Sequence, residues 1–282
     1  KMSAIRSLRS LLAFSHKIHL FRAFHASKAR FSLNVDYQNL SKFYAFDNWW
    51  TDERLKPLRA MNELRIPLIV NQLLNDKTIN SHKPLSGFTL LDVGSGGGFV
   101  SEPLARLGAS VTGIDANAQC VEFTNSRLRD RCTQLKSNLN YVHTTVEQFL
   151  SNETREKFDA VIASEVLEHI DDVESFIQSC HSLLKSNGHL FITTINQTLA
   201  AYLLAIVAAE KLLGLVPDGI HEYNKLVPLL GLKVMLEKND FRPKLIHGMC
   251  FNPITQRWSW TWNTSVNYAI VAVKSLKVKT ST

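Results

Sequence analysis

Short apolar runs alternate with amphipathic stretches over most of the chain from Thr89 onward. The apolar runs predict buried β-strands, and they are TLLDV (89–93), SVTGID (110–115), NYVHTTV (140–146), FDAVIAS (158–164) and HLFITTIN (189–196). The stretches between them predict helices, the clearest being SEPLARLG, AQCVEFTNSRLRDRC and SFIQSCHSLLKSNG, the last of which is expected to end at Gly188. Strands and helices in alternation predict a parallel sheet with helices on both faces.

Two further apolar segments close the pattern with no predicted helix between them. They are FRPKLIHGMC (241–250) and VNYAIVAVKS (266–275), and we expect them to form a terminal antiparallel hairpin. No internal repeat and no low-complexity linker interrupts the chain. The pattern therefore predicts one α/β domain, which is expected to begin near Asp36 and to occupy residues 36–282.

The formal net charge of +7 could indicate a nucleic-acid partner, but it is concentrated at the N-terminus. Seven Lys and Arg side chains and no acidic residue precede Asp36, so the remaining chain is about neutral. A neutral body argues against nucleic-acid binding. Residues 1–35 are rich in Arg, Ser and apolar residues, which is typical of a mitochondrial transit peptide, and a basic solvated tail is the alternative.

Cysteine usage and hydropathy limit the class further. The cysteines are Cys120, Cys132, Cys180 and Cys250. They lack the CxxC spacing of a zinc site, so we expect reduced, buried thiols. The longest apolar stretch, at 199–217, is interrupted by Glu210 and Lys211, so no transmembrane helix is predicted.

A glycine-rich turn, LLDVGSGGGF, follows the first predicted strand, and the second strand ends at Asp115. Glycines let a backbone approach a ligand closely, and a carboxylate at that position is placed to accept hydrogen bonds from ribose hydroxyls. A dinucleotide fingerprint would need glycine where Phe99 stands, so a nicotinamide site is disfavoured. The GxGxG spacing with Asp115 resembles the class I methyltransferases, which bind S-adenosylmethionine and have an antiparallel last strand.

The fourth predicted strand runs into SEVLEHI, which places Ser164 and three metal-competent side chains at the carboxyl edge of the sheet. If VLEHI begins a helix, Glu165, Glu168 and His169 share one face of it. They would then form a candidate metal or acid–base cluster. The alternative is that the glutamates favour the helix N-terminus through its dipole and that His169 packs.

The segments WWTDERLKPLRAMNELRIPLI, LLDVGSGGG, GASVTGID, SEVLEHI and YLLAIVAAEKLLGLVPDGIHEYNK, in this order, resemble the ubiquinone-biosynthesis O-methyltransferase family. The resemblance runs from about Phe43 to Lys274. The tryptophan pair with NELR and the AAEKLLGLVP block are its most specific parts. It implies a class I S-adenosylmethionine-dependent fold, with a seven-stranded Rossmann-like sheet and an apolar helical insertion after the fifth strand, at 199–230.

The resemblance also implies an activity and a set of site residues. The mitochondrial form methylates polyprenylated catechols, 3,4-dihydroxy-5-polyprenylbenzoate and demethylubiquinol. The residues implied to hold S-adenosylmethionine are Arg65, Gly94, Asp115 and Ser164. Glu165, Glu168 and His169 resemble the family's magnesium ligands, with Glu165 and His169 placed in catalysis. A divalent cation would stabilise the phenolate and orient the catechol, and manganese or zinc would also suit an imidazole ligand.

Location and partners follow from the same resemblance. It implies peripheral attachment to the matrix side of the mitochondrial inner membrane, within a multi-subunit ubiquinone-biosynthesis complex. The stretch at 199–217 would contact lipid or admit a polyprenyl tail, with an ordinary core helix as the alternative. Trp49 and Trp50 are expected either to cover the cofactor as an N-terminal lid or to pack in the core. The sequence departs from the family at Ser95, commonly Cys, and at Arg59, commonly His.

Two functional alternatives stay open at the level of sequence. One is a methyltransferase in which His169 acts as a general base without metal. The other is a noncatalytic S-adenosylmethionine-binding subunit of the ubiquinone-synthesis complex.

Overall fold

The computed structural model describes residues 34–35, 48–75, 82–152, 155–201 and 223–275. The chain separates into two compact units, Lys1–Val35 and Asp36–Thr282. Most of the predicted transit peptide, the expected start of the body and residues 202–222 of the predicted insertion lie outside the described residues.

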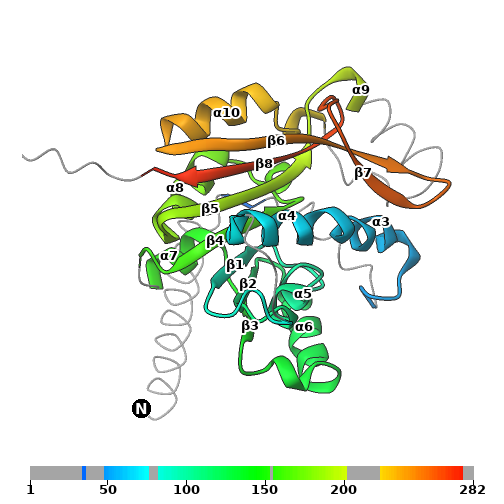
Figure 1. Cartoon of the computed structure of the whole chain (residues 1–282), viewed down its shortest axis with the longest axis vertical. Helices are drawn as coiled ribbons and strands as arrows, with labels where there is room; N and C mark the ends of the chain where they lie inside the picture. The colour runs from blue at the N-terminus through cyan, green and yellow to red at the C-terminus, as the bar shows by residue number, and fades with distance from the viewer. Residues whose placement is uncertain (1–33, 36–47, 76–81, 153–154, 202–222, 276–282) are drawn as a thin grey trace, which may run out of the picture. The chain divides into compact units, whose positions relative to one another are not determined.

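Within the described residues of the larger unit, one eight-stranded sheet has the order β3-β2-β1-β4-β5-β8-β6-β7 (Figure 1). The strand bounds are β1 Thr89–Val93, β2 Ser110–Asp115, β3 Leu139–His143, β4 Phe158–Ser164, β5 Leu184–Ile195, β6 Phe241–Asn252, β7 Arg257–Thr261 and β8 Asn267–Lys274. The first five pair in parallel, and β8 lies antiparallel between β5 and β6. The predicted α/β fold with an antiparallel terminal strand is confirmed.

The helices connect these strands. Their bounds are η2 Glu53–Leu55, α3 Lys56–Ala60, α4 Asn62–Leu74, α5 Ser101–Arg106, α6 Ala118–Asp130, η3 Thr133–Leu135, α7 Val146–Asn152, η4 Leu167–His169, α8 Val173–Leu183, α9 Leu199–Ala201, η6 Tyr223–Lys225 and α10 Leu229–Lys238. Side-chain caps fix the starts of α6 and α8, because Asn117 accepts a hydrogen bond from the Gln119 N–H and Asp172 accepts one from the Ser175 N–H.

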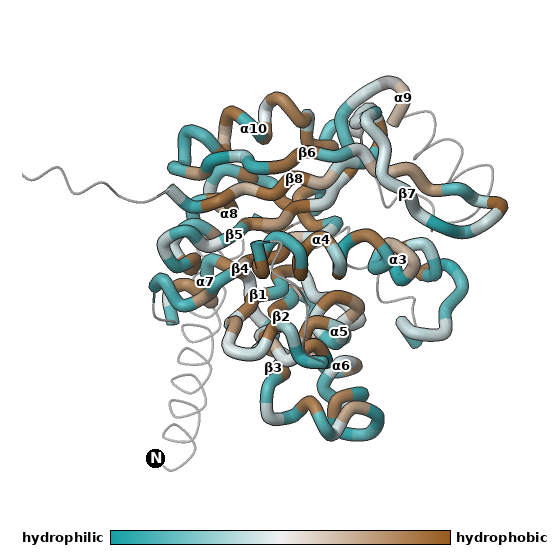
Figure 2. The backbone as a smooth tube through the Cα atoms, viewed as in Figure 1, coloured by the Kyte–Doolittle hydropathy of each residue, from teal (hydrophilic) through white to brown (hydrophobic). Residues whose placement is uncertain are grey.

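The central strands β1, β4 and β8 are buried on both faces, which explains why they are apolar nearly throughout rather than alternating. On one face α7, α8 and α10 cover Leu91, Val161 and Ile270. On the other, α4, α5 and α6 cover Leu90 and Ile162. Adjacent residues of one strand thus belong to opposite cores. Figure 2 shows the central strands mostly in the colour of hydrophobic residues.

The sheet has eight strands where seven were expected. The extra strand, β7, comes from RWSWT and pairs antiparallel with β6 at the outer edge of the sheet. The prediction that 241–250 and 266–275 pair with each other is correct, since Phe241 lies opposite Lys274. The direct hairpin connection is wrong, because β7 lies between the two in sequence. An edge strand with an exposed face lacks the apolar run by which the other strands were recognised.

The predicted end of the helix in SFIQSCHSLLKSNG, which is α8, is also wrong. Helix α8 ends at Leu183 rather than at Gly188, and β5 already begins at Leu184. Leu184 has an extended backbone and pairs with Phe158 of β4. The consecutive leucines fit a helical pattern, but both are fully buried because the chain turns there from helix to strand.

Phe158 offers a test of this core. Its ring is fully buried beside Phe149, with centroids 6.1 Å apart. Phe158→Ala should lower the free energy of unfolding by about 3–5 kcal/mol, because it removes buried apolar surface and leaves a cavity. Urea unfolding would measure this, and Phe158→Leu, which keeps most of the volume, should lose less than about 1.5 kcal/mol. Equal losses in the two variants would contradict tight packing at this position.

Candidate active site

The glycine-rich turn joins β1 to α5 at the carboxyl edge of the sheet. Gly94, Gly96 and Gly98 have φ values of +70°, +50° and +79°, which side chains rarely adopt. A Cβ on Gly94 would lie 2.5 Å from Val166 Cγ2, and one on Gly97 would lie 2.6 Å from Trp49 Cβ. The turn is therefore restricted to glycine both by its backbone and by the side chains packed over it.

Asp115 ends β2 beside this turn. Its Oδ2 accepts a hydrogen bond of 2.7 Å from the Gly96 N–H, and its Oδ1 accepts one of 2.7 Å from the Asn117 N–H. Burial raises the pKa of Asp115, and the two backbone hydrogen bonds oppose that rise. The carboxylate is thus fixed next to the glycine turn, and each oxygen keeps a lone pair with which to accept a ribose hydroxyl.

Arg65 reaches the same edge from α4. Its guanidinium donates to Ser164 Oγ at 2.7 Å, to Asn62 Oδ1 at 3.0 Å and to the Leu58 carbonyl at 2.5 Å. The residue is only 4% exposed, and burial lowers the pKa of Arg65 to about 10, with Glu165 and Asp92 opposing the shift. Arg65 therefore stays a cation at neutral pH.

Ser164 connects this arginine to the neighbouring strand. The Ser164 hydroxyl lies 2.7 Å from the Thr193 hydroxyl, across the parallel pair β4 and β5. The structure thus brings together Arg65 and Ser164, which are 99 residues apart in the sequence. Their predicted roles in holding the cofactor stay predictions.

The helix expected after Ser164 is not formed. Only Leu167–His169 is helical, as a single 3-10 turn, and Glu165 precedes it with a φ of +56°. The shared helical face predicted for Glu165, Glu168 and His169 is therefore wrong. In the part of the chain that the structure describes, no three His, Cys, Asp or Glu side chains are grouped as a metal ion would require. The three residues as placed do not fit the predicted magnesium centre.

Glu168 lies inward, while Glu165 and His169 are half-buried at the rim. Glu168 Oε2 accepts a hydrogen bond of 2.8 Å from the Thr194 hydroxyl. Burial raises the pKa of Tyr268 above its usual range, and the charges of Glu168 and Glu165 raise it further. The Tyr268 hydroxyl donates to the Val227 carbonyl at 2.9 Å. Both glutamates thus lie at the β5–β8 edge of the candidate site.

Asp92 is a buried acid that the sequence analysis did not single out. It lies on β1 beneath the glycine turn and accepts a hydrogen bond of 2.5 Å from the Ser101 hydroxyl. Burial raises the pKa of Asp92 to about 6, against the opposing effects of Ser101 and Arg65. An acidic residue inside the otherwise apolar run TLLDV was the available signal.

Trp49 and Trp50 cover the glycine turn. Trp49 is buried against Phe99 and Cys120, and the Trp50 indole donates a 2.8 Å hydrogen bond to the Gly97 carbonyl. Arg59 holds this segment through its guanidinium, which donates to the Trp49 carbonyl at 2.9 Å and to the Asp52 carbonyl at 2.8 Å. A histidine at this position could not donate two such bonds from one nitrogen.

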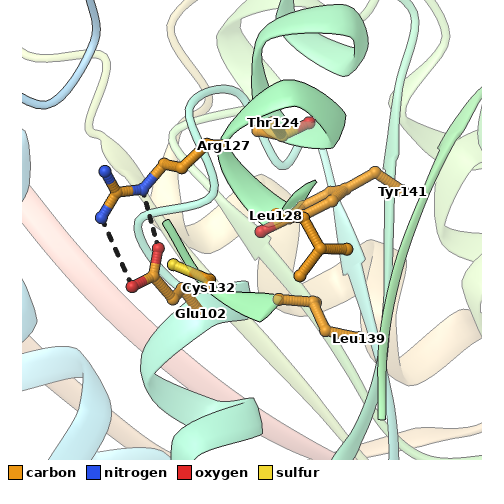
Figure 3. Close-up of a pocket in the computed structure, with 7 residues that line it drawn as sticks. All are labelled: Glu102, Thr124, Arg127, Leu128, Cys132, Leu139 and Tyr141. Carbon is orange, nitrogen blue, oxygen red and sulfur yellow. Dashed lines mark hydrogen bonds and ion pairs between the residues drawn. The ribbon is translucent and has the colours of Figure 1, made fainter. Parts of the chain in front are cut away.

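Figure 3 shows a pocket lined by Glu102, Thr124, Arg127, Leu128, Cys132, Leu139 and Tyr141. Glu102 accepts hydrogen bonds from Arg127 at 2.9 Å and from Arg106 at 2.7 Å. The pocket has no room for a water molecule and contains none of the predicted site residues. Its role is structural, because the Arg127 guanidinium also stacks 3.9 Å from the centre of the Trp50 ring.

The residues around the turn fit an adenosyl cofactor. Ser95 Oγ and Asn117 Nδ2 are buried, and neither atom has a hydrogen-bond partner among the described residues. They flank the glycine turn and Asp115, so a nucleoside bound there would find unused polar atoms. The cysteines take no part in this site. Three are buried as predicted, whereas Cys250 is exposed.

The topology, the glycine turn and the acid that ends β2 define a class I S-adenosylmethionine-dependent methyltransferase. A family model described as a methyltransferase domain matches residues 59–244. The magnesium protoporphyrin IX methyltransferase from Synechocystis, solved with bound SAH, has the same fold, with a TM-score of 0.57 at 21% identity over 85% of this chain and 94% of that one.

The chain belongs to the ubiquinone biosynthesis O-methyltransferase family. It is 41% identical to the mitochondrial enzyme of Rattus norvegicus, over 96% of this chain and 79% of the relative. It is 42% identical to that of Homo sapiens, over 96% and 74%, and 36% identical to the enzyme of Pelagibacter ubique, over 86% and 99%. The chain is accordingly an S-adenosylmethionine-dependent O-methyltransferase, and the nicotinamide alternative is wrong.

Gly94→Ala should weaken S-adenosylmethionine binding at least ten-fold, because the added Cβ meets Val166 and the positive φ is strained. Titration calorimetry would measure the dissociation constant. Gly87→Ala is the matched control, since Gly87 has a φ of +89° but nothing within 4 Å of an added Cβ. Gly87→Ala should bind the cofactor like the unaltered protein. Normal binding by Gly94→Ala would remove this turn from the cofactor site.

Asp92 predicts a pH dependence of stability. Its folded pKa of about 6 exceeds its ordinary value of 3.8, so between these values the folded state holds a proton that the unfolded state has lost. The contribution of Asp92 to stability therefore falls as pH rises from 4 to 6. Asp92→Asn should match the unaltered protein near pH 4 and be more stable at pH 7 by up to roughly 3 kcal/mol.

Unfolding by urea at both pH values would measure this difference. An Asp92→Asn variant whose advantage over the unaltered protein does not grow with pH would show that burial does not penalise the Asp92 anion.

Proposed function

We propose that this chain transfers the methyl group of S-adenosylmethionine to a phenolic oxygen of polyprenylated catechols, 3,4-dihydroxy-5-polyprenylbenzoate and demethylubiquinol. Membership of the ubiquinone biosynthesis O-methyltransferase family supports the pathway. The observation that carries the assignment of the site is the buried Arg65, which donates to Ser164 directly beside Glu165. Arg65 thus connects the proposed cofactor site to the segment beginning at Glu165, which would face the catechol.

The cofactor would be held by residues from four elements. Asp115 accepts the ribose hydroxyls, and the backbone at Gly94 lies beneath the ribose and methionine. Arg65 pairs with the methionine carboxylate, a task suited to a guanidinium that stays charged when buried. Ser164, already hydrogen-bonded to Arg65, completes that end of the pocket. Trp49 and Trp50 exclude water from the glycine turn.

The chemical step is an in-line displacement. The catechol hydroxyl gives its proton to His169, and the oxygen lone pair forms the new O–CH₃ bond. The S–CH₃ bond breaks and its electron pair stays on sulfur, so that the sulfonium becomes the neutral thioether of S-adenosylhomocysteine. The positive charge passes from the sulfonium to the His169 imidazolium, and alignment of the reacting atoms is the protein's main contribution, worth about 7–11 kcal/mol. His169 then releases its proton to solvent.

Glu165, which precedes the same 3-10 turn, would orient the imidazolium and the catechol. Glu168, hydrogen-bonded to Thr194, would hold that turn to β5. Magnesium dependence stays a prediction of the family resemblance. Because the three side chains as placed do not form a metal group, no step here passes through a cation.

We place the protein in mitochondria, because the relatives from Rattus norvegicus and Homo sapiens are named as mitochondrial. Attachment to the matrix side of the inner membrane and membership of a multi-subunit ubiquinone-biosynthesis complex are part of the same proposal. The described residues include no helix long and apolar enough to cross a membrane.

Methyl transfer to a short-chain prenylated dihydroxybenzoate tests the assignment. His169→Gln and Glu165→Gln should lower kcat by roughly 10²–10⁴-fold, because the first removes the proposed base and the second removes the carboxylate that orients it. S-adenosylmethionine affinity, measured separately, should be unchanged. Asp171→Asn is the matched control. Asp171 is exposed, lies next to the same turn, and its carboxylate pairs with Lys225. The variant should keep full activity.

The metal question is settled by the same assay after chelation and dialysis, with magnesium, manganese or zinc added back. Activity that survives chelation and is lost in His169→Gln would support the base mechanism. Activity that requires an added cation, and is lost equally in the Glu165 and His169 variants, would replace that mechanism by the metal-assisted one. Full activity of both variants would remove the 165–169 segment from catalysis.

A further inference from the structure

Arg127 connects the tryptophan cover to the helices on either side of β2. It belongs to α6, and its guanidinium carbon lies 3.9 Å from the centre of the Trp50 ring. Its Nε donates a 2.9 Å hydrogen bond to Glu102 Oε2, and its Nη2 donates one of 3.4 Å to Glu102 Oε1 (Figure 3). Glu102 belongs to α5, the helix that follows the glycine turn. One side chain thus contacts α5 and the cover from α6.

This arrangement uses a property that arginine has and lysine lacks. A guanidinium is planar and donates its hydrogen bonds within that plane, so its faces remain free to stack on an aromatic ring. Arg127 donates two hydrogen bonds to one carboxylate and stacks on the indole of Trp50 at the same time. Tryptophan is the aromatic side chain that attracts a cation most strongly. The contact therefore holds the indole in one place.

Glu102 is a firm anchor for Arg127. It is buried, and it also accepts a 2.7 Å hydrogen bond from Arg106. Burial raises the pKa of Glu102, but the hydrogen bonds from Arg127 and Arg106 oppose this and leave the pKa below its ordinary value. The carboxylate is therefore charged at neutral pH. Because Arg106 also binds it, a variant that lacks Arg127 would not leave a buried charge without a partner.

Trp50 in turn holds the glycine turn. Its indole N–H donates a 2.8 Å hydrogen bond to the Gly97 carbonyl, and its ring meets Phe99 edge-on with centroids 5.3 Å apart. The preceding residue, Gly96, donates its N–H to Asp115 at 2.7 Å. The tryptophan and the carboxylate thus fix the turn at neighbouring residues.

Arg59 has a different task from Arg127. Its two hydrogen bonds go to the carbonyls of Trp49 and Asp52, so they stay within residues 49–59 and shape the cover itself. The contacts of Trp50 with Gly97 and Arg127 join the cover to the rest of the domain. The path from Glu102 through Arg127 and Trp50 therefore ends on the backbone of the turn.

We propose that Arg127 is a positioning residue for S-adenosylmethionine, which holds the Trp50 indole on Gly97 and thereby keeps the glycine turn in the conformation that binds the cofactor. The inference rests on the methyltransferase class of the chain and not on the proposed catechol substrate. A turn that adopts its binding conformation for a smaller fraction of the time binds with a proportionally weaker apparent affinity. The effect of Arg127 should therefore appear in cofactor affinity rather than in the chemical step.

Titration calorimetry of the full chain with S-adenosylmethionine and S-adenosylhomocysteine tests the proposal. Arg127→Gln should raise both dissociation constants by roughly three- to ten-fold, because the contact with the ring of Trp50 is lost. With saturating S-adenosylmethionine, kcat on a short-chain prenylated dihydroxybenzoate should stay within about two-fold of the unaltered value. Arg127→Lys keeps the charge but not the planar fork, so its affinity should lie between those of the other two proteins.

A double-mutant cycle determines whether Arg127 acts through Trp50. Trp50→Leu removes the ring and the indole N–H, and it should itself weaken cofactor binding. In that background Arg127→Gln should cause no further loss, because the group through which Arg127 acts is absent. Arg129→Gln is the matched control, since it removes the same charge from an exposed position of the same helix. Arg129→Gln should bind the cofactor like the unaltered protein.

Four results would overturn the proposal. Unchanged affinity in Arg127→Gln would limit the residue to a structural role. An equal loss with and without the Trp50 ring would mean that Arg127 acts by another route. An equal loss in Arg129→Gln would assign the effect to net charge. A fall in kcat with unchanged affinity would place Arg127 in the chemical step.

The test is independent of the proposed substrate, because calorimetry needs no methyl acceptor. Urea unfolding of each variant identifies any that fails to fold. If Arg127→Gln does so, Arg127→Lys takes its place in the cycle, and equal affinity of Arg127→Lys and the unaltered protein would then refute the proposal.

Discussion

A buried cation organises the candidate active site. Taking a guanidinium out of water is costly unless its hydrogen bonds are satisfied, and Arg65 finds acceptors on α4, on α3 and at the end of β4. These contacts require α4 to lie across the carboxyl edge of the sheet, with its apolar side against Leu90 and Ile162. The packing of α4 on the sheet and the placement of the positive charge in the site therefore depend on one another, because α4 also carries Arg65.

The same edge shows how acids and bases are distributed by depth. Asp92 and Glu168 are buried and hydrogen-bonded to hydroxyl groups, while Glu165 and His169 stay half-buried at the rim. The charges of Glu165 and Asp92 offset the desolvation of Arg65, and the rim residues remain accessible to a substrate. The glycine turn lies at the same edge, where Val166 packs against Gly94 and Trp49 packs against Gly97.

The sequence was sufficient for the fold and for the cofactor edge, because both depend on local patterns. Apolar runs predicted the five parallel strands, and the glycine turn with Asp115 lies where the alternation placed it. The pattern failed where long-range packing decides. The two leucines at 183–184 switch from helix to strand because Leu184 pairs with Phe158. VLEHI forms one 3-10 turn after a left-handed Glu165, a backbone choice that side-chain periodicity does not encode. Strand β7 was missed because Trp260 and its polar neighbours are exposed, so the strand has no apolar run.

The cover over the glycine turn comes from a segment that precedes the sheet in the sequence. Trp49 and Trp50 come some forty residues before β1, yet they fill the space above Gly97 and shield Phe99. A chain cut to the sheet and its crossover helices would keep the topology of the fold but leave its cofactor turn bare. A shortened gene, or a graft of this domain into another protein, should therefore begin before Trp49 rather than at β1.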